Sequence, residues 1–593
     1  MLRAPAVNRP RVPVLLAALG GLVSSVARAD SPPPVSRTGA YSRYERETIE
    51  MVSRDRKLEL DPAPEDKVIE AIDVVSLDVI EPRDPVPGIL NLLHHTSRPH
   101  VIRRESLLQV GEPYRKVLAD ETARNLRRYS QLSLVLVLPV RGSAPDRVRL
   151  TIVTKDTWSL RLNWDAAFSS GGLERLVLAP TETNLLGYQH TVGAQLSVLP
   201  ASFETGLRYS IPRVLGSRIA ASAATSLIVR REGGHVEGSS GGVSIGQSLF
   251  STRTPWAWNV GASWRNEIVR RYVNASLAIF DSPLTDRPGD LPFLYRSNTA
   301  AASASVTRSL GWALKNDFTL ALDYTRRHYS VPSARRQDPV ALADFRRRYV
   351  PTSDDRLSPS LQWQTYRTDF LRTIDLDSLG LQEDVRLGHL VTVRVYPSSS
   401  HLGSTRTVFG LAASAAYTQA LGDGYARVSA SSITEWQPDR LSDGSLTLGT
   451  HIATPLLPFG RFVLDATMLN RYRNYLNRTS SLGGDGRLRG WRTGELVGDN
   501  LVAYNVEARS RPVQVLSCQL GGVLFYDAGA TPDTLRHLDM KQSLGGGLRA
   551  LFPQLDRVVF RADLGFPIQA GGLPRGVNPV NFFFAFGQAL DAL

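Results

Sequence analysis

The chain has 593 residues, of which 42% are hydrophobic and 21% are charged, and this balance excludes a wholly disordered protein. Its formal net charge is +13, but the basic residues are spread along the chain, which does not favour a nucleic-acid-binding protein. The single cysteine, Cys518, excludes an intramolecular disulfide and a zinc site built from cysteines.

The first 29 residues have the composition of a secretion signal. They contain no acidic residue, they begin with three arginines, and an apolar stretch from Val12 to Val23 follows. Ala27-Arg28-Ala29 supplies the small residues of a cleavage site. We therefore predict that residues 1–29 are a signal peptide and that the chain is exported. Past them no apolar run approaches 18 residues, so a helical membrane protein is not expected.

Residues 30–66 are rich in proline, serine and charge, which predicts a linker or a short helix, the helix from Tyr41 to Arg54. Residues 67–157 predict a small α+β domain in the order β-α-α-β-β. A generic α+β linker domain would give the same pattern. The predicted elements are a strand at 68–80, helices at 101–110 and 116–129, and strands at 132–140 and 148–153.

From residue 159 onward the period of the hydrophobic pattern is two. Leu160, Leu162 and Trp164 alternate with polar residues, and similar runs recur to the end of the chain. A soluble array of β-sandwiches would alternate in the same way, but three features favour a membrane barrel. No helix signal interrupts the strands, aromatic residues mark strand ends, and the exported chain has no disulfide pairs. Because backbone polar groups must be paired in lipid, we expect residues 159–593 to form an antiparallel transmembrane β-barrel of sixteen strands.

Three motifs follow one another between residues 482 and 529. The alternation places Glu507 and Asp527 on the inward faces of two adjacent strands. Arg489 can bond carboxylates through two parallel donors, and Gly490 lets the backbone of its loop approach the barrel wall closely. In chain order the motifs are Leu488-Arg489-Gly490-Trp491 in a long loop, Asn505-x-Glu507-x-Arg509 on a strand, and Phe525-x-Asp527-x-Gly529 on the next strand.

These motifs resemble those of the BamA/TamA superfamily of outer-membrane assembly and translocation barrels. Asn184-Leu185-Leu186-Gly187 and residues 581–588 resemble its early and last strands, and residues 101–114 resemble the helix-to-helix step of a POTRA domain. The resemblance implies a barrel in the bacterial outer membrane with its POTRA-like domain in the periplasm. It also implies that Arg489 docks on Asp527 and Glu507 and fixes the loop inside the barrel, supported by Leu488, Gly490, Trp491, Phe525 and Gly529.

Two functions follow from this resemblance. The first is a factor that docks unfolded polypeptide on the POTRA-like domain and assists its insertion into the outer membrane, through a weakly paired seam between the first strand, near 159–168, and the last strand, 581–590. The alternative is a secretion pore that translocates a specific partner protein, with residues 41–54 as a helix that plugs the lumen. A structural barrel without a transport role is a third interpretation.

The partners expected on this basis are proteins and lipids. They are unfolded outer-membrane or secreted proteins, outer-membrane lipids and lipopolysaccharide, and periplasmic or lipoprotein subunits, and nucleic acid is not among them.

The sequence contains only weak signals of catalysis. Residues 238–242 fit a G-x-S-x-G pattern, but no helix follows, so we interpret them as a hairpin turn. His94-His95 lacks ligand spacing, and we expect neither an enzyme nor a bound cofactor or metal.

Overall fold

The computed structural model describes most of the chain from residue 41 to residue 589. The predicted signal peptide, residues 1–29, lies outside the described residues. Among those that are described, no helix is long and apolar enough to span a membrane. The residues not described within this range are 83, 85–87, 89–90, 92–93, 170–171, 274, 286–290, 333–337, 485, 517, 556, 570–571 and 574–576.

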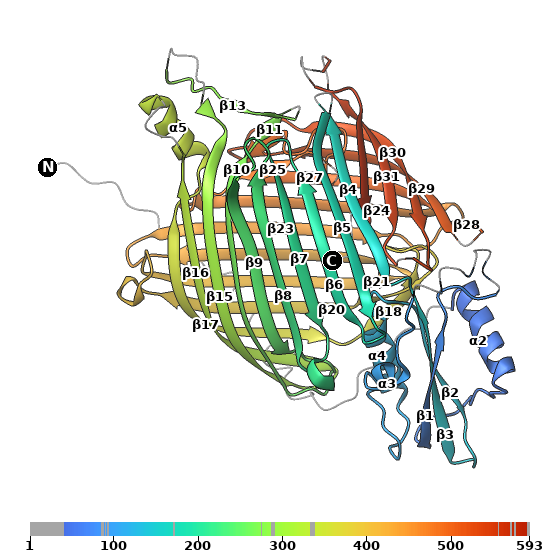
Figure 1. Ribbon diagram of the computed structural model, residues 1–593. Coiled ribbons are helices and arrows are strands. Elements are labelled where there is room, and N and C mark those ends of the chain that lie inside the picture. The colour runs from blue at the N-terminus through green and yellow to red at the C-terminus, as the bar shows by residue number, and fades with distance from the viewer. Residues whose placement is uncertain are drawn as a thin grey trace.

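Most of the chain forms one closed β-barrel (Figure 1). Its wall contains 21 segments, of which β27 and β28 are two parts of one strand because both pair with β29, so the described residues form 20 strands. In chain order the segments are β4 (Leu160–Ser169), β5 (Gly172–Leu185), β6 (His190–Val198), β7 (Ser202–Ile211), β8 (Ala220–Arg230), β9 (Val236–Gln247), β10 (Trp256–Arg270), β15 (Leu294–Leu310), β16 (Leu314–Ser330), β17 (Asp354–Arg367), β20 (Gly388–Ser398), β21 (Val408–Leu421), β22 (Gly424–Trp436), β23 (Leu441–Ala453), β24 (Gly460–Asn474), β27 (Leu501–Ser510), β28 (Val513–Val515), β29 (Cys518–Ala530), β30 (Lys541–Leu551), β31 (Phe560–Ile568) and β32 (Asn581–Phe586).

The prediction of sixteen strands was wrong, although the mainly β fold and the closed antiparallel barrel are confirmed. The barrel wall contains more alternating runs than the sixteen strands expected. Several connections are too short to separate two strands clearly in the sequence, since only Gly422 and Asp423 lie between β21 and β22. Strand number therefore could not be obtained by dividing the chain length by a typical repeat.

The inner and outer faces of the wall differ as the alternation predicts. On β27, Tyr504 and Val506 are exposed on the outer face, whereas Asn505 and Glu507 are buried on the inner face. The same alternation along the other strands places leucine, valine and aromatic side chains on the outside. A barrel with this surface has the apolar outer band that a bilayer requires.

Residues 238–242 do not form the predicted hairpin turn but lie within β9. Gly241 faces the ring of Trp264 on the neighbouring strand β10, and a Cβ atom on Gly241 would lie 2.5 Å from Cη2 of that ring. The Trp264 indole N–H also donates to Ser239 Oγ at 3.3 Å. The glycine and serine residues of this run therefore make room for an aromatic side chain on the barrel wall.

Residues 67–157 form an α+β module next to one end of the barrel, which we call the near end (Figure 1). Its sheet has the order β1-β3-β2, with β1 (Val68–Leu77) parallel to β3 (Arg147–Asp156) and β2 (Leu132–Arg141) antiparallel to it. The helices α3 (Pro99–Arg103) and α4 (Lys116–Arg127) pack on one face of this sheet. α3 is shorter than the predicted helix because Ser106 Oγ bonds the backbone of Leu108 and competes with helical bonding.

The helix α2 (Arg43–Asp55) packs on the opposite face of the same sheet. Ser42 and Glu45 form a capping box at its start. Its side chain Val52 is buried against Leu136 and Val153 of the module. The helix therefore lies outside the lumen, and the interpretation of residues 41–54 as a lumen plug was wrong.

Two segments leave the wall and turn into the lumen. One comes from the far end of the barrel and contains β25 (Ser480–Leu482) and β26 (Leu496–Gly498), and the other comes from the near end and contains β18 (Phe370–Ile374) and β19 (Gln382–Arg386). The remaining elements belong to connections between barrel strands. They are η3 (Val214–Gly216), β11 (Tyr272–Val273), β12 (Ser276–Leu277), β13 (Ile279–Phe280), β14 (Leu291–Pro292), α5 (Pro339–Tyr349) and η5 (Ser400–Leu402).

Candidate functional site

The loop between β24 and β27 descends from the far end and contacts the inner wall. Gly490 lies flat against β30 and β31, because a Cβ atom there would lie 2.3 Å from Ser543 Cβ and 2.8 Å from Pro567 N. The Gly490 carbonyl accepts a hydrogen bond from Asn581 Nδ2 of the last strand at 2.7 Å. The loop backbone therefore touches the final strands of the barrel directly, as only a glycine permits at this position.

Arg489 is completely buried and is the centre of the site. Its Nε donates to Asp527 Oδ2 at 2.9 Å and its Nη2 to Asp527 Oδ1 at 2.8 Å. Its backbone N–H donates to Asp527 Oδ2 at 3.0 Å, and its Nη1 donates to Glu507 Oε1 at 2.5 Å. The guanidinium also lies 3.6 Å from the centroid of the Phe525 ring, which adds a cation–π contact. The structure thus brings together the arginine and both carboxylates that the motifs suggested.

The supporting residues of the motif surround this pair. Leu488 and Trp491 are buried in an apolar cluster with Leu482, and the Trp491 indole N–H donates to the Gln542 carbonyl at 2.9 Å. A Cβ atom on Gly529 would lie 2.8 Å from Leu482 Cδ1, so the absence of a side chain there makes room for the loop. The motif residues therefore hold the loop by apolar packing as well as by the ion pairs of Arg489.

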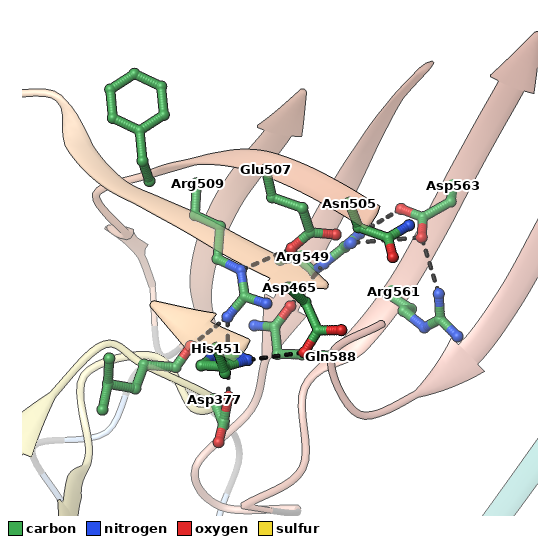
Figure 2. Close-up of polar contacts among 12 residues, drawn as sticks. Asp377, His451, Asp465, Asn505, Glu507, Arg509, Arg549, Arg561, Asp563 and Gln588 are labelled. Carbon is green, nitrogen blue, oxygen red and sulfur yellow. Dashed lines mark hydrogen bonds and ion pairs between the residues drawn. The ribbon is translucent and has the colours of Figure 1, made fainter. Parts of the chain in front are cut away.

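Additional charged residues that the sequence motifs did not indicate complete the site. Asp563 on β31 lies 3.6 Å from Arg489 Nη1 and accepts hydrogen bonds from Arg549 at 2.5 Å and Arg561 at 3.0 Å. Figure 2 shows this cluster next to Glu507, which also accepts from Arg509 Nε at 2.8 Å. Asp563 lies on the polar face of a predicted strand, and that parity was the only sequence signal for it.

The cluster therefore alternates acids and arginines across the inner faces of β27, β29, β30 and β31. Each buried charge in it has an opposite charge within hydrogen-bond distance, which offsets the cost of burial. Arg549 Nε also donates to Gln588 Oε1 at 3.0 Å, just beyond β32. The arrangement can hold a loop and the C-terminal strands in one geometry.

The first and last strands meet at a weak junction, which we call the seam. Among the residues that the structure describes, two positions are paired between β4 and β32, namely Ala166 with Phe584 and Ala167 with Phe583. By comparison, β4 pairs with β5 at ten positions and β31 pairs with β32 at six. On the outer side the ring of Trp164 lies 6.0 Å from that of Phe584, centroid to centroid.

The early-strand motif Asn184-Leu185-Leu186-Gly187 contacts the α+β module. Asn184 Nδ2 donates to Asp156 Oδ2 at 3.1 Å and to the His95 carbonyl at 2.9 Å. Gly187 has a left-handed φ of 78°, and a Cβ atom there would lie 2.7 Å from the Thr96 carbonyl oxygen. The motif therefore joins the turn between β5 and β6 to the module.

His94 also belongs to this junction and not to a metal site. Its Nε2 lies 3.2 Å from Asp156 Oδ2 and its Nδ1 lies 3.3 Å from Ser159 Oγ, directly before β4. Within the described part of the chain no group of three or more histidine, cysteine or acidic residues could hold a metal ion.

The structure is a closed barrel with an inward loop whose Arg489 meets Asp527 and Glu507, the arrangement that the resemblance to the BamA/TamA superfamily implied. No protein-family model and no curated protein matches the sequence. Among solved structures, BamA from Haemophilus ducreyi lacking POTRA domains 1–3 is similar with 13% identity and a TM-score of 0.34, covering 94% of this chain and 99% of that chain. CdiB from Escherichia coli has 11% identity and a TM-score of 0.40, covering 97% and 96%. CdiB from Acinetobacter baumannii has 10% identity and a TM-score of 0.38, covering 97% of both chains. At these identities and scores we base the function on the geometry of this chain alone.

Proposed function

We propose that this chain is an outer-membrane protein that docks unfolded polypeptide on its α+β module, in the periplasm, and assists the insertion of that polypeptide into the membrane. The observation that carries the proposal is the seam, where the described parts of β4 and β32 share two paired positions. A barrel that only had to be stable would pair its first and last strands along their length, because unpaired backbone groups are costly in lipid.

An opened seam would expose two strand edges to the bilayer. A client strand can add to such an edge through main-chain hydrogen bonds, which do not depend on the client's sequence. The start of β4 also lies next to the α+β module, since β4 begins at Leu160 and the module ends at residue 157. A polypeptide held on the module would therefore arrive close to the edge of β4.

The Arg489 cluster, in this proposal, holds the strands beside the seam in place while β4 moves. Asn581 of β32 donates to the Gly490 carbonyl, and Arg549 of β30 donates to Gln588. These contacts tie the last strand to the loop. We infer that opening takes place by displacement of β4, while β32 stays with the cluster.

A secretion pore is the second candidate, and one feature favours it. A polar cavity of about 560 Å³ lies at the near end of the lumen. One part of it is lined by Arg128, Tyr129, Ser130 and Gln131 of the module. The wall contributes small or uncharged side chains, among them Thr191, Ser210, Ser222, Ser244, Asn259, Ser305 and Thr307. Such a surface would let an extended chain pass without strong attachment.

A cysteine pair across the seam tests the insertion proposal. In a Cys518→Ser background, Ala166→Cys with Phe584→Cys places two thiols at directly paired positions, where a disulfide can form. Oxidation should stop insertion of client barrels, measured as the outer-membrane proteome after depletion of the wild-type chain. The matched control is Ala413→Cys with Ser432→Cys, between the fully paired strands β21 and β22.

The outcomes of this experiment separate the candidate functions. Loss of several barrels on oxidation, restored by a reductant and absent in the control, supports insertion through the seam. Loss of a single exported protein supports secretion instead. An unchanged proteome in cells that contain only the oxidised seam variant would overturn insertion through the seam.

A further inference from the structure

The connection between β17 and β20 is unusually long for the near end of this barrel. It runs from residue 368 to residue 387, whereas the near-end connections between β15 and β16 and between β21 and β22 have three and two residues. Within it β18 and β19 pair at five positions and form a hairpin. We call residues 368–387 the near-end hairpin.

The tip of this hairpin fills part of the lumen. Leu376 is buried against the inward-facing side chains Tyr425, Ala453 and Val463 of three wall strands. Leu379 and Leu381 are buried against Leu551 and Val559 on the opposite side of the tip. Apolar contacts on two sides show that the tip is packed inside the barrel and does not hang from its rim.

The tip has a fixed internal structure. The Glu383 carboxylate accepts hydrogen bonds from the backbone N–H groups of Asp377 at 3.0 Å and Ser378 at 2.9 Å, and from the Ser378 hydroxyl at 2.5 Å. Asp375 accepts from the Gly380 N–H at 2.6 Å, and Gly380 has a left-handed φ of 70°. A turn braced in this way can move as one body without unfolding.

The outer part of the hairpin is held by α4 of the α+β module. Arg127 donates to Asp384 Oδ2 from Nε at 2.9 Å and from Nη2 at 2.6 Å. Arg372 lies 3.4 Å from Asp120, and Arg124 lies over the ring of Phe370 at 4.3 Å. The contacts with the module are therefore mainly ionic. Those with the barrel wall combine the apolar packing of the tip with hydrogen bonds, among them Arg461 Nη2 to the Ile374 carbonyl at 3.0 Å and Thr373 Oγ1 to the Asp423 carbonyl at 2.7 Å.

The inner part of the hairpin touches the Arg489 cluster. Arg509 Nη1 donates to the Leu376 carbonyl at 2.7 Å, and the same guanidinium lies 3.8 Å from Asp377 (Figure 2). Arg509 also bonds Glu507, which bonds Arg489. The near-end hairpin thus lies between the module and the loop that descends from the far end.

We propose that the near-end hairpin is a plug that closes one side of the lumen and that α4 holds it shut through the Arg127–Asp384 pair. When the module shifts, as on binding a polypeptide, the ionic contacts break and the braced hairpin swings out of the barrel. Its departure joins the space it filled to the polar cavity along β6–β10. This inference goes beyond the proposed function, because a gated lumen does not depend on whether the client is inserted or secreted.

Ion conductance of the purified full chain in a planar lipid bilayer tests the plug. Arg127→Glu places two acids opposite each other, and we expect a several-fold rise in open-channel events. Asp384→Arg alone should give the same rise, and the double variant Arg127→Glu with Asp384→Arg should return to the wild-type level, because the pair is restored with reversed charges. The matched control is Arg149→Glu, which breaks an exposed ion pair with Asp73 elsewhere on the module.

A second variant removes the plug and keeps the module intact. Replacing residues 375–381 by two glycines should leave conductance high and insensitive to the Arg127→Glu change. Wild-type conductance in both charge variants, or in the shortened hairpin with a folded barrel, would overturn the proposal. Should the shortened chain fail to fold, the charge reversal and its rescue decide the question. A client-insertion assay on the same variants keeps this result separate from the proposed insertion function.

Discussion

Arg489 and Asp527 are joined by three hydrogen bonds, two from the guanidinium and one from the Arg489 backbone N–H, although they are 38 residues apart in the sequence. The backbone bond matters because it fixes the loop itself, while the guanidinium fixes the side chain. Asp527 therefore receives the loop as a whole, and Glu507 neutralises the second edge of the same guanidinium.

Replacing Arg489 by alanine should loosen the loop without preventing formation of the barrel. The change leaves Asp527 and Glu507 buried without their partner, and losing one member of a buried pair costs about 3–5 kcal/mol. We expect faster protease cleavage between β24 and β27, together with reduced client insertion. Arg489→Lys is the control that keeps the charge but cannot bond both carboxylates in the same plane. Its rate of protease cleavage and its client insertion should therefore lie between those of the wild-type chain and Arg489→Ala. Unchanged protease protection and full activity in Arg489→Ala would contradict the assignment.

Replacing Gly490 by alanine should displace the loop although it adds a single methyl group. Its Cβ atom would meet Ser543 Cβ at 2.3 Å and the backbone of Phe566 and Pro567 within 3 Å, and backbone atoms cannot move aside easily. We expect the free energy of unfolding to fall by about 1–3 kcal/mol, the usual cost of overpacking, and the melting temperature to fall with it. Gly546→Ala is the matched control on the outer face of β30, where the nearest atom is a Leu524 methyl at 3.4 Å. Equal melting temperatures for the two variants would rule out the close approach.

Much of this site could be predicted from the sequence because a strand has a period of two. That period alone placed Glu507 and Asp527 on the inner face, and the resemblance to the BamA/TamA superfamily implied that Arg489 meets them. Asp563 could be placed on an inner face in the same way. Its contact with Arg489 could not, because the pattern within one strand does not say which loop lies against it.

The near-end hairpin and the position of α2 lay beyond sequence reasoning for a related reason. Leu379 and Leu381 alternate like residues of a membrane strand, and only their packing against Leu551 and Val559 shows that they lie inside the lumen. The short apolar stripe of α2 fits a plug or a docked helix equally well. In both cases the local pattern predicts the strand or helix. The surface against which that element packs depends on residues distant in the sequence, which the local pattern does not identify.

Replacing His94 by alanine should weaken the junction between the α+β module and the barrel. His94 links Asp156, at the end of β3, to Ser159, directly before β4, and the Asp156 carboxylate is fully buried. We expect faster proteolytic cleavage between residues 156 and 160, while the barrel itself stays folded. His95→Ala is the control, since the neighbouring His95 side chain is exposed. Equal cleavage rates for the two variants would show that the histidine does not hold the junction.

The loop that contains α5 should lose stability in acid because of Asp344. Burial alone would raise the pKa of Asp344, but hydrogen bonds from Arg348, Arg347 and Ser282 outweigh it and lower the pKa from about 3.8 to about 2. Since the folded-state pKa is the lower one, the stabilisation is complete above about pH 3.8 and is lost as the pH falls toward 2. Pepsin cleavage of this loop, normalised to an unfolded substrate, should therefore accelerate between pH 4 and pH 2 in the wild-type chain. Asp344→Asn lacks the titrating group and should be cleaved quickly at both pH 4 and pH 2. Parallel pH profiles for the two chains would exclude Asp344 as the source of the acid sensitivity.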